Sequence, residues 1–124
     1  SRITIVTSGT DMVIEQIMAQ LDRLVPVHTV SDLTLEGPHL AREMMLIKLV
    51  STGEQRMEAL RLADAFRARV VDATTESFVF EMTGAGDKLD AFIALMRPLG
   101  LAEVVRTGVV AIGRGQAFLS SAKV

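Results

Sequence analysis

The feature that most limits how this chain can fold is the order of hydrophobic patterns between residues 42 and 112. A nearly continuous apolar run is followed by a helical repeat, two short strand patterns, a second helical repeat and a final strand pattern. This βαββαβ order is typical of ferredoxin-like domains. We therefore predict an α+β fold in which a four-stranded antiparallel sheet carries both helices on one face.

The strand patterns differ in strength. Residues 42–50 (REMMLIKLV) predict a central strand, because their apolar side chains run almost without interruption. Short strands are expected at residues 70–73 and 77–83, and a last strand at residues 103–112 with a bend at Gly108. Alternation is clearest in the third strand, where three large side chains share one face: Phe78, Phe80 and Met82.

Two helices are expected in this part of the chain. The first runs from about Gln55 to Arg69, and the pairs Thr52/Gln55 and Ser51/Glu54 both fit a capping box at its start. The second follows the loop at residues 84–87 and ends at Pro98. Their core-facing side chains are predicted to be Ala59, Leu62, Ala63 and Phe66 in the first helix, and Leu89, Phe92, Ile93 and Met96 in the second.

The N-terminal segment predicts a shorter β-α-β unit, with strands at residues 2–7 and 27–35. The helix between them is defined by apolar residues at helical spacing: Ile14, Ile17, Met18, Leu21, Leu24 and Val25. A β-α-β unit is the back half of a βαββαβ domain, so we expect tandem ferredoxin-like domains of which the first is incomplete.

The break at Glu36-Gly37-Pro38-His39 places the expected domain boundary. We predict an incomplete first domain over residues 1–36 and a complete second domain over residues 37–115. Residues 116–124 are expected to form a flexible tail.

Composition excludes several classes of protein. Apolar residues make up 49% of the chain, which argues against disorder, and a net charge of −2 argues against a general nucleic-acid binder. The absence of cysteine excludes disulfides, thiol catalysis and cysteine–zinc sites. No apolar run approaches the ~20 residues of a membrane-spanning helix, and no signal peptide opens the sequence, so we expect a cytoplasmic protein without a membrane partner.

The loop from Ser51 to Arg56 precedes a helix, so its amides offer a place for an anion. The same topology occurs in acylphosphatases, in which such a loop with an arginine binds phosphate. Gly53 is the single glycine of this loop, however, and Arg56 is expected inside the helix. We favour a plain helix cap.

The run Phe78-Val79-Phe80 has the aromatic spacing of an RNA-recognition domain, which shares this topology. Such a motif requires basic residues and glycines around the aromatics, whereas this strand is flanked by Glu76 and contains Glu81. We therefore expect the phenylalanines to pack under the helices.

Two further patterns carry little chemistry. Gly113-Arg114-Gly115 lacks the lysine and the following helix of a phosphate loop, so a flexible exit from the last strand is expected. His28 and His39 lie in different segments, and a zinc site needs three or four convergent ligands. We expect surface histidines and no metal site.

Charged residues decorate the first helix of the second domain and the turn after it. The spacing of Glu58 and Arg61 predicts a local ion pair on a solvated face, and partner binding remains the alternative. The residues are Glu54, Arg56, Glu58, Arg61, Asp64, Arg67 and Arg69.

Four runs together resemble the C-terminal domain of one family, the small regulatory subunit of acetohydroxyacid synthase (acetolactate synthase). They are REMMLIKLV at residues 42–50, FRARVVDATTESFVFEMTG at residues 66–84, KLDAFIALMRPLG at residues 88–100 and EVVRTGVVAIGRG at residues 103–115. The segment before them resembles the end of the ACT domain that precedes this domain in the family.

The resemblance implies a non-catalytic regulatory subunit of branched-chain amino-acid biosynthesis. Such subunits dimerise through ACT domains, bind and activate a catalytic large subunit, and confer feedback inhibition by valine. Thiamine diphosphate, magnesium and FAD are then expected on the catalytic partner, and no cofactor is expected in this chain.

The resemblance carries no site residue to this sequence. The family's effector pocket is built mainly from segments that precede the part resembled here, so the effector-binding residues are unknown and no catalytic, cofactor-binding or metal residue is assigned. Two alternatives remain, namely a stand-alone amino-acid-sensing ACT-type regulator without an enzyme partner and an enzyme on the same scaffold.

Overall fold

The computed structural model describes residues 1–119. The chain divides into two compact units. The central unit comprises Arg42–Val109, and the terminal unit comprises Ser1–Ala41 together with the chain from Val110 onward.

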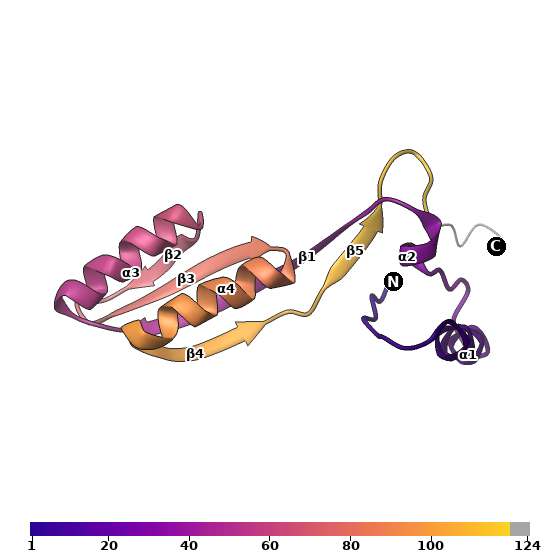
Figure 1. Ribbon diagram of the computed structural model, residues 1–124, viewed down its shortest axis with the longest axis horizontal. Helices are drawn as coiled ribbons and strands as arrows, with labels where there is room; N and C mark the ends of the chain where they lie inside the picture. The colour runs from indigo at the N-terminus through magenta and orange to yellow at the C-terminus, as the bar shows by residue number, and fades with distance from the viewer. Residues whose placement is uncertain (120–124) are drawn as a thin grey trace. The chain divides into compact units, whose positions relative to one another are not determined.

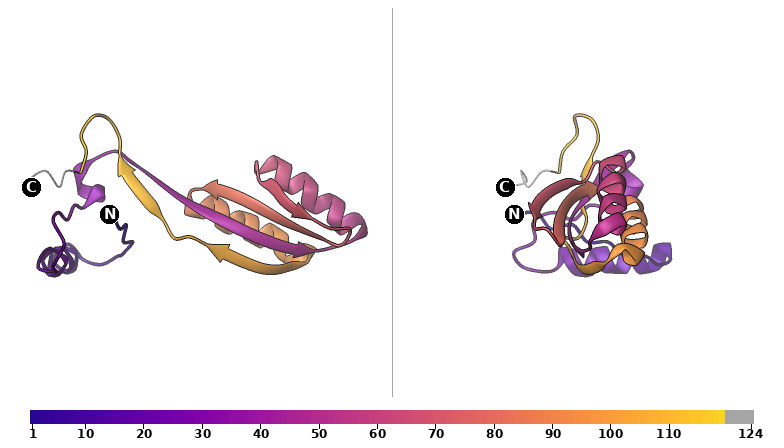
Figure 2. Two further views of the ribbon diagram at one scale, coloured as in Figure 1. Left: turned by 180° about the vertical axis from the view of Figure 1, so that it is seen from behind. Right: turned by 90° about the vertical axis from the view of Figure 1, so that its left-hand side faces the viewer.

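The central unit has the βαββαβ order that the sequence predicts (Figure 1). Its elements are β1 (His39–Val50, which begins in the terminal unit), α3 (Gly53–Ala65), β2 (Arg69–Ala73), β3 (Ser77–Gly84), α4 (Gly86–Met96), a 3-10 turn (Arg97–Leu99) and β4 (Leu101–Arg106). The sheet order is β2-β3-β1-β4, and all three pairings are antiparallel. Both helices lie on one face of this sheet (Figure 2), so the predicted α+β class is confirmed.

The core of the central unit lies between the sheet and the two helices. Met45, Ile47 and Leu49 of β1 are fully buried, and they alternate with exposed residues along the strand. The Phe92 ring of α4 packs 5.3 Å from the ring of Phe66, measured between centroids. The remaining buried apolar residues are Ala59, Ala63, Phe78, Phe80, Met82, Leu89 and Met96. Full burial of each large apolar side chain contributes about 1.5–3 kcal/mol.

The ends of α3 differ from the prediction. Thr52 is the N-cap but accepts no side-chain hydrogen bond, so the predicted capping boxes are wrong. The helix stops at Ala65 because Arg67 adopts a left-handed conformation with φ of 59°. The amide of Ala68 then donates to the carbonyl of Ala63 at 2.8 Å, the closing hydrogen bond of a Schellman motif.

Gly100 lies very close to the backbone of Val50. It has a φ of 107°, and its carbonyl accepts from the amide of Val50 at 2.9 Å. A Cβ atom at this position would lie 2.1 Å from the carbonyl oxygen of Val50. Only glycine fits between the end of α4 and the start of β4 without a shift of the backbone.

The terminal unit contains α1 (Asp11–Asp22), α2 (Leu33–Glu36), the first residues of β1 and the strand β5 (Val110–Gly113), which pairs with β1. Thr10 caps α1, because its side chain accepts from the amide of Val13. Four of the six residues predicted on the apolar face of α1 are half-buried: Ile14, Ile17, Met18 and Leu21. Leu24 and Val25 were wrongly predicted on this face, because they follow the end of the helix and are exposed.

Both strands predicted in the N-terminal segment are wrong. Residues 2–7 form neither helix nor strand, and residues 27–32 form no strand before α2 begins. Side chains instead of a backbone ladder hold the first segment, since Arg2 donates to the carbonyl of Ala111 at 2.7 Å and Thr4 Oγ1 accepts from its amide at 3.4 Å. Residues that favour β-structure form a strand only where a neighbouring strand is available to share backbone hydrogen bonds.

The predicted last strand is divided into β4 and β5. The interruption contains Gly108, with a φ of 87°, so the expected bend becomes a break. Residues 116–119 form no helix or strand, and residues 120–124 of the expected tail lie outside the described residues. Across residues 1–119, no helix has the length and apolar character needed to cross a membrane.

None of the described residues of the terminal unit is buried. Many of its large apolar side chains are exposed, up to 93% for Val25 and 83% for Ile3. Others are Ile5, Val6, Met12, Leu24, Leu35, Val110, Ile112 and Phe118. This unit therefore has no hydrophobic core of its own within the described part of the chain.

Candidate functional site

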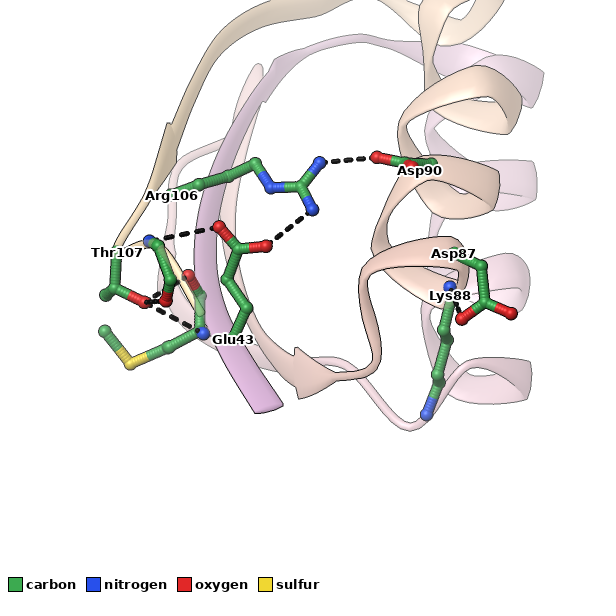
Figure 3. Close-up of polar contacts among 8 residues, drawn as sticks. Glu43, Asp87, Lys88, Asp90, Arg106 and Thr107 are labelled. Carbon is green, nitrogen blue, oxygen red and sulfur yellow. Dashed lines mark hydrogen bonds and ion pairs between the residues drawn. The ribbon is translucent and has the colours of Figure 1, made fainter. Parts of the chain in front are cut away.

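One charged cluster in the central unit joins three elements (Figure 3). Arg106 at the end of β4 donates through Nη2 to Glu43 Oε1 of β1 at 2.6 Å. Its other terminal nitrogen, Nη1, donates to Asp90 Oδ1 of α4 at 2.5 Å. One guanidinium thus bridges two carboxylates, which suits its fixed fork of donors.

The second oxygen of Glu43 holds the backbone after β4. Glu43 Oε2 accepts from the amide of Gly108 at 3.0 Å. Immediately before it, the amide of Thr107 donates to the carbonyl of Met44 at 3.0 Å, and the Met44 amide donates to Thr107 Oγ1 at 3.2 Å. Glu43 therefore adds a side-chain attachment to β1 within the break between β4 and β5, both of which pair with β1.

The electrostatics of the cluster favour its charged form. The side chain of Glu43 is 8% exposed and that of Arg106 is 28% exposed. The hydrogen bond from Arg106 lowers the pKa of Glu43 by more than burial raises it. The pKa of Arg106 is raised, first by its hydrogen bond to Glu43 and then by that to Asp90.

A small open pocket lies beside this cluster. It has a volume of about 350 Å³ and is lined by Asp90, Ile93, Ala94, Arg97 and Arg106. Its one carboxylate, Asp90, already accepts from Arg106. These five side chains therefore offer no pair of groups for general acid–base chemistry.

The face of the sheet opposite the helices carries a mixed surface, which we call the open sheet face. It exposes Met44, Leu46 and Val105, the last by 55%. Two exposed ion pairs flank these residues, Lys48 with Glu103 at 3.8 Å and Arg69 with Glu81 at 3.6 Å. Ion pairs that are exposed to solvent in this way contribute little to stability.

The loop from Ser51 to Arg56 does not form the arginine-bearing anion site that was the alternative to a helix cap. Arg56 lies within α3, where its guanidinium stacks 3.8 Å from the ring centroid of Phe78 and donates to the Ser77 carbonyl at 3.3 Å. Ser51 Oγ is buried and has no hydrogen-bond partner, so it does not face solvent as a ligand group would.

Phe78 and Phe80 lie in the core, as expected, with 4% and 0% exposure. Their rings pack against each other at 5.3 Å between centroids. Aromatic rings that are covered in this way are not available to stack on bases.

The remaining predicted candidates do not converge. His28 and His39 are both exposed, and His39 Nδ1 lies 3.2 Å from the carbonyl oxygen of Gly37. The described residues contain no group of three or more side chains that suits a metal ion. Arg114 follows β5, and its amide donates to the Pro38 carbonyl at 3.0 Å.

Most charged residues of α3 lie on a solvated face, as expected, but Arg56 is half-buried against Phe78. Glu58 and Arg61 make the predicted local ion pair, and the Arg61 side chain is 75% exposed. Arg69 reaches Glu81 on the neighbouring strand β3.

Sequence reasoning missed the Glu43–Arg106–Asp90 cluster. One signal was present, because Glu43 occupies the same side of the strand as the buried Met45, Ile47 and Leu49. A carboxylate at a buried strand position requires a positively charged partner. Nothing in the local sequence shows that this partner is Arg106, 63 residues away.

Comparisons with known proteins found similar sequences that cover most of this chain. A family model described as the small subunit of acetolactate synthase matches residues 42–115. The chain is 45% identical over 115 residues to a probable acetolactate synthase small subunit of Archaeoglobus fulgidus, covering 93% of this chain and 71% of the relative. It is 41% identical to the isozyme 3 small subunit of Escherichia coli, covering 96% of this chain and 73% of that relative.

A solved structure is similar as well. The crystal structure of the acetolactate synthase small subunit from Thermotoga maritima superposes with a TM-score of 0.78 at 38% sequence identity. The match covers 89% of this chain and 68% of that chain.

Proposed function

The chain belongs to the family of acetolactate synthase small subunits, and we propose that it is a regulatory subunit of that enzyme. In this proposal it binds the thiamine-diphosphate-dependent large subunit in the cytoplasm, raises its activity and confers feedback inhibition by valine. Thiamine diphosphate, magnesium and FAD would belong to the large subunit.

One observation carries the proposal. The family match over residues 42–115 spans the compact central unit, Arg42–Val109, in full. The relatives named above align over more than nine tenths of this chain, so the terminal unit is included in the likeness. These relatives are named as small subunits of one enzyme.

The surface of the terminal unit supports self-association. Its described residues include no buried side chain and many exposed large apolar ones. Exposed apolar surface of this kind marks places where proteins associate. We propose that a second copy of the chain covers this surface, including residues 1–35, and that the domain boundary near residues 36–37 separates an ACT-type part from the C-terminal domain.

Reconstitution with the large subunit tests the proposed function. Acetolactate formation from pyruvate would be measured for the large subunit alone, for this chain alone and for the mixture, with thiamine diphosphate, magnesium and FAD present. We expect no activity from this chain alone, a higher rate for the mixture than for the large subunit, and inhibition of the mixture by valine.

The possible failures are distinct. A mixture no faster than the large subunit, with no complex in size-exclusion chromatography, would contradict the proposal and favour a stand-alone amino-acid sensor. Pyruvate condensation by this chain alone would contradict its assignment as non-catalytic.

A further inference from the structure

The chain passes between the two units at only two places, residues 41–42 and residues 109–110. Glu43 lies within two residues of the first passage, and Gly108 lies within two residues of the second. These two residues are joined by a hydrogen bond of 3.0 Å from the Gly108 amide to Glu43 Oε2. The bond thus ties together the two connecting segments where they leave the central unit.

The attachment of the outgoing segment depends on side chains at this point. Backbone pairing of β1 with β4 runs from Leu49 to Met45, and Met45 pairs with Arg106. Beyond it, one backbone hydrogen bond holds Thr107, and the next amide, that of Gly108, is held by the Glu43 carboxylate. Gly108 has a φ of 87° and lies in the break between β4 and β5, both of which pair with β1.

The carboxylate is itself held in place. Its other oxygen accepts from Arg106, which is anchored in turn to Asp90 on α4. The side chain of Glu43 is 8% exposed, whereas that of Asp90 is 68% exposed. Glu43 is therefore the most buried carboxylate of the cluster. Arg106 connects Asp90 of α4 to Glu43, which in turn holds the Gly108 amide (Figure 3).

We propose that Glu43 is a positioning residue that holds residues 107–109 against β1 through its hydrogen bond to the Gly108 amide, an attachment that we call the latch. In this proposal, the inhibition of the enzyme complex by valine depends on the latch. The first part rests on the geometry alone, and the second rests on the proposed function. Any change that travels along the backbone between the units must pass these two segments, because they are its covalent connections.

The variant Glu43→Gln tests the latch directly. Both oxygens of Glu43 accept from donors, and glutamine replaces one of them with an NH₂ group that faces a donor. Loss of a hydrogen bond to a charged group is expected to raise amide exchange at residues 107–109 by about tenfold or more. Hydrogen exchange with mass spectrometry on the full chain measures this, and exchange in β3 should stay unchanged.

A matched control is available on the same pair of strands. Glu103→Gln removes one carboxylate from an exposed pair between β1 and β4, 3.8 Å from Lys48, and should leave exchange at residues 107–109 unchanged. If Glu43→Gln does not fold, Arg106→Lys gives a second test, because lysine has a single terminal nitrogen where the guanidinium uses one for Glu43 and another for Asp90. Unchanged exchange at residues 107–109 in the folded variant would overturn the latch.

The regulatory part has a separate readout. In the complex with the large subunit, Glu43→Gln should keep activation but shift the valine concentration for half-inhibition by about fivefold or more, the lower range of allosteric coupling. An unshifted valine response in a complex whose exchange has risen would overturn the coupling and leave the latch standing. Failure of the wild-type chain to activate the large subunit would contradict the proposed function without affecting the exchange result.

Discussion

The central and terminal units differ in how they use apolar residues. In the central unit, β1 and β3 alternate buried and exposed side chains under two helices, and Phe80 and Phe92 are fully buried. In the terminal unit, α1 has a comparable apolar face, yet its described residues reach only half-burial. An apolar pattern therefore indicates which face of an element packs against another surface. That face is buried only where a second surface is present to cover it.

The two units are therefore expected to differ in whether their own residues suffice for a stable fold. The central unit has a sheet, two helices and a closed core, so it is expected to fold from its own residues. The terminal unit leaves Ile3, Val25 and Phe118 more than 80% exposed, so its stability depends on what covers it.

The largest effect is expected from Phe92→Ala. The Phe92 ring is fully buried and packs against both Phe66 and Phe80. Removing it should lower the free energy of unfolding of the central unit by about 3–5 kcal/mol, measured by chemical denaturation.

Met57→Ala provides the comparison for this core variant. Met57 lies on α3 and is 70% exposed, so its truncation should change the free energy of unfolding by less than about 0.5 kcal/mol. Equal losses for the two variants would mean that the core described here does not carry the stability of the unit.

The next largest effect is expected from Gly100→Ala. A Cβ atom would lie 2.1 Å from the Val50 carbonyl oxygen, and the residue has a φ of 107°. The backbone strain alone costs about 1–3 kcal/mol, and the steric clash adds to it. Thermal unfolding should show a clear loss for this variant.

Gly53→Ala separates strain from clash. Gly53 also has a positive φ, of 62°, but nothing lies within 4 Å of an added Cβ. Its loss should therefore be smaller than that of Gly100→Ala. If the two losses were the same, the close approach between Gly100 and Val50 would have no energetic weight.

The contribution of Glu43 should depend on pH. Its pKa in the folded chain lies below the ordinary value of 4.5, because of Arg106. The stabilisation is therefore complete above pH 4.5 and is lost as the pH falls through the folded-state pKa. Arg106 and Asp90 are the charged groups that face it.

Thermal unfolding of the wild type and of Glu43→Gln between pH 7 and pH 3 measures this dependence. The gap in melting temperature should be widest at neutral pH and should close in acid. A gap that stays constant across this range would show that the carboxylate charge contributes nothing to the fold.

The smallest effect is expected from Glu103→Gln. The pair with Lys48 is exposed and 3.8 Å long, so its loss should change the free energy of unfolding by about 0.5 kcal/mol or less. Chemical denaturation of this variant beside the wild type checks it. A loss above about 1 kcal/mol would mean that the open sheet face is more tightly organised than its exposure indicates.

The sequence predicts the central unit well because each of its helices and strands has a clear periodicity of apolar residues. The alternation at residues 77–83 and the helical spacing of Leu89, Phe92 and Met96 both reflect burial against a neighbour that is present in the chain. The strands predicted at residues 2–7 and 27–35 failed because β-branched composition indicates only a preference. A strand forms where another strand accepts its backbone hydrogen bonds, and that partner is a long-range property.

The charged cluster shows the same limit at a site. A buried Glu43 can be inferred from its place in an apolar strand, but its partners come from β4, from α4 and from the backbone at Gly108. Pairing of this kind is set by the sheet register, in which Met45 lies opposite Arg106. Register in turn depends on the whole fold, so local patterns do not reveal the site.

Sedimentation velocity of the full chain at micromolar concentration tests the central claim most directly. The claim is that the central unit is complete in itself and that the exposed apolar surface of the terminal unit is covered by a second copy. We expect a dimer for the wild type, and a monomer with an intact central unit for Met12→Asp, which places a charge on α1 at a side chain that is 69% exposed. A wild-type chain that sediments as a monomer would contradict this account.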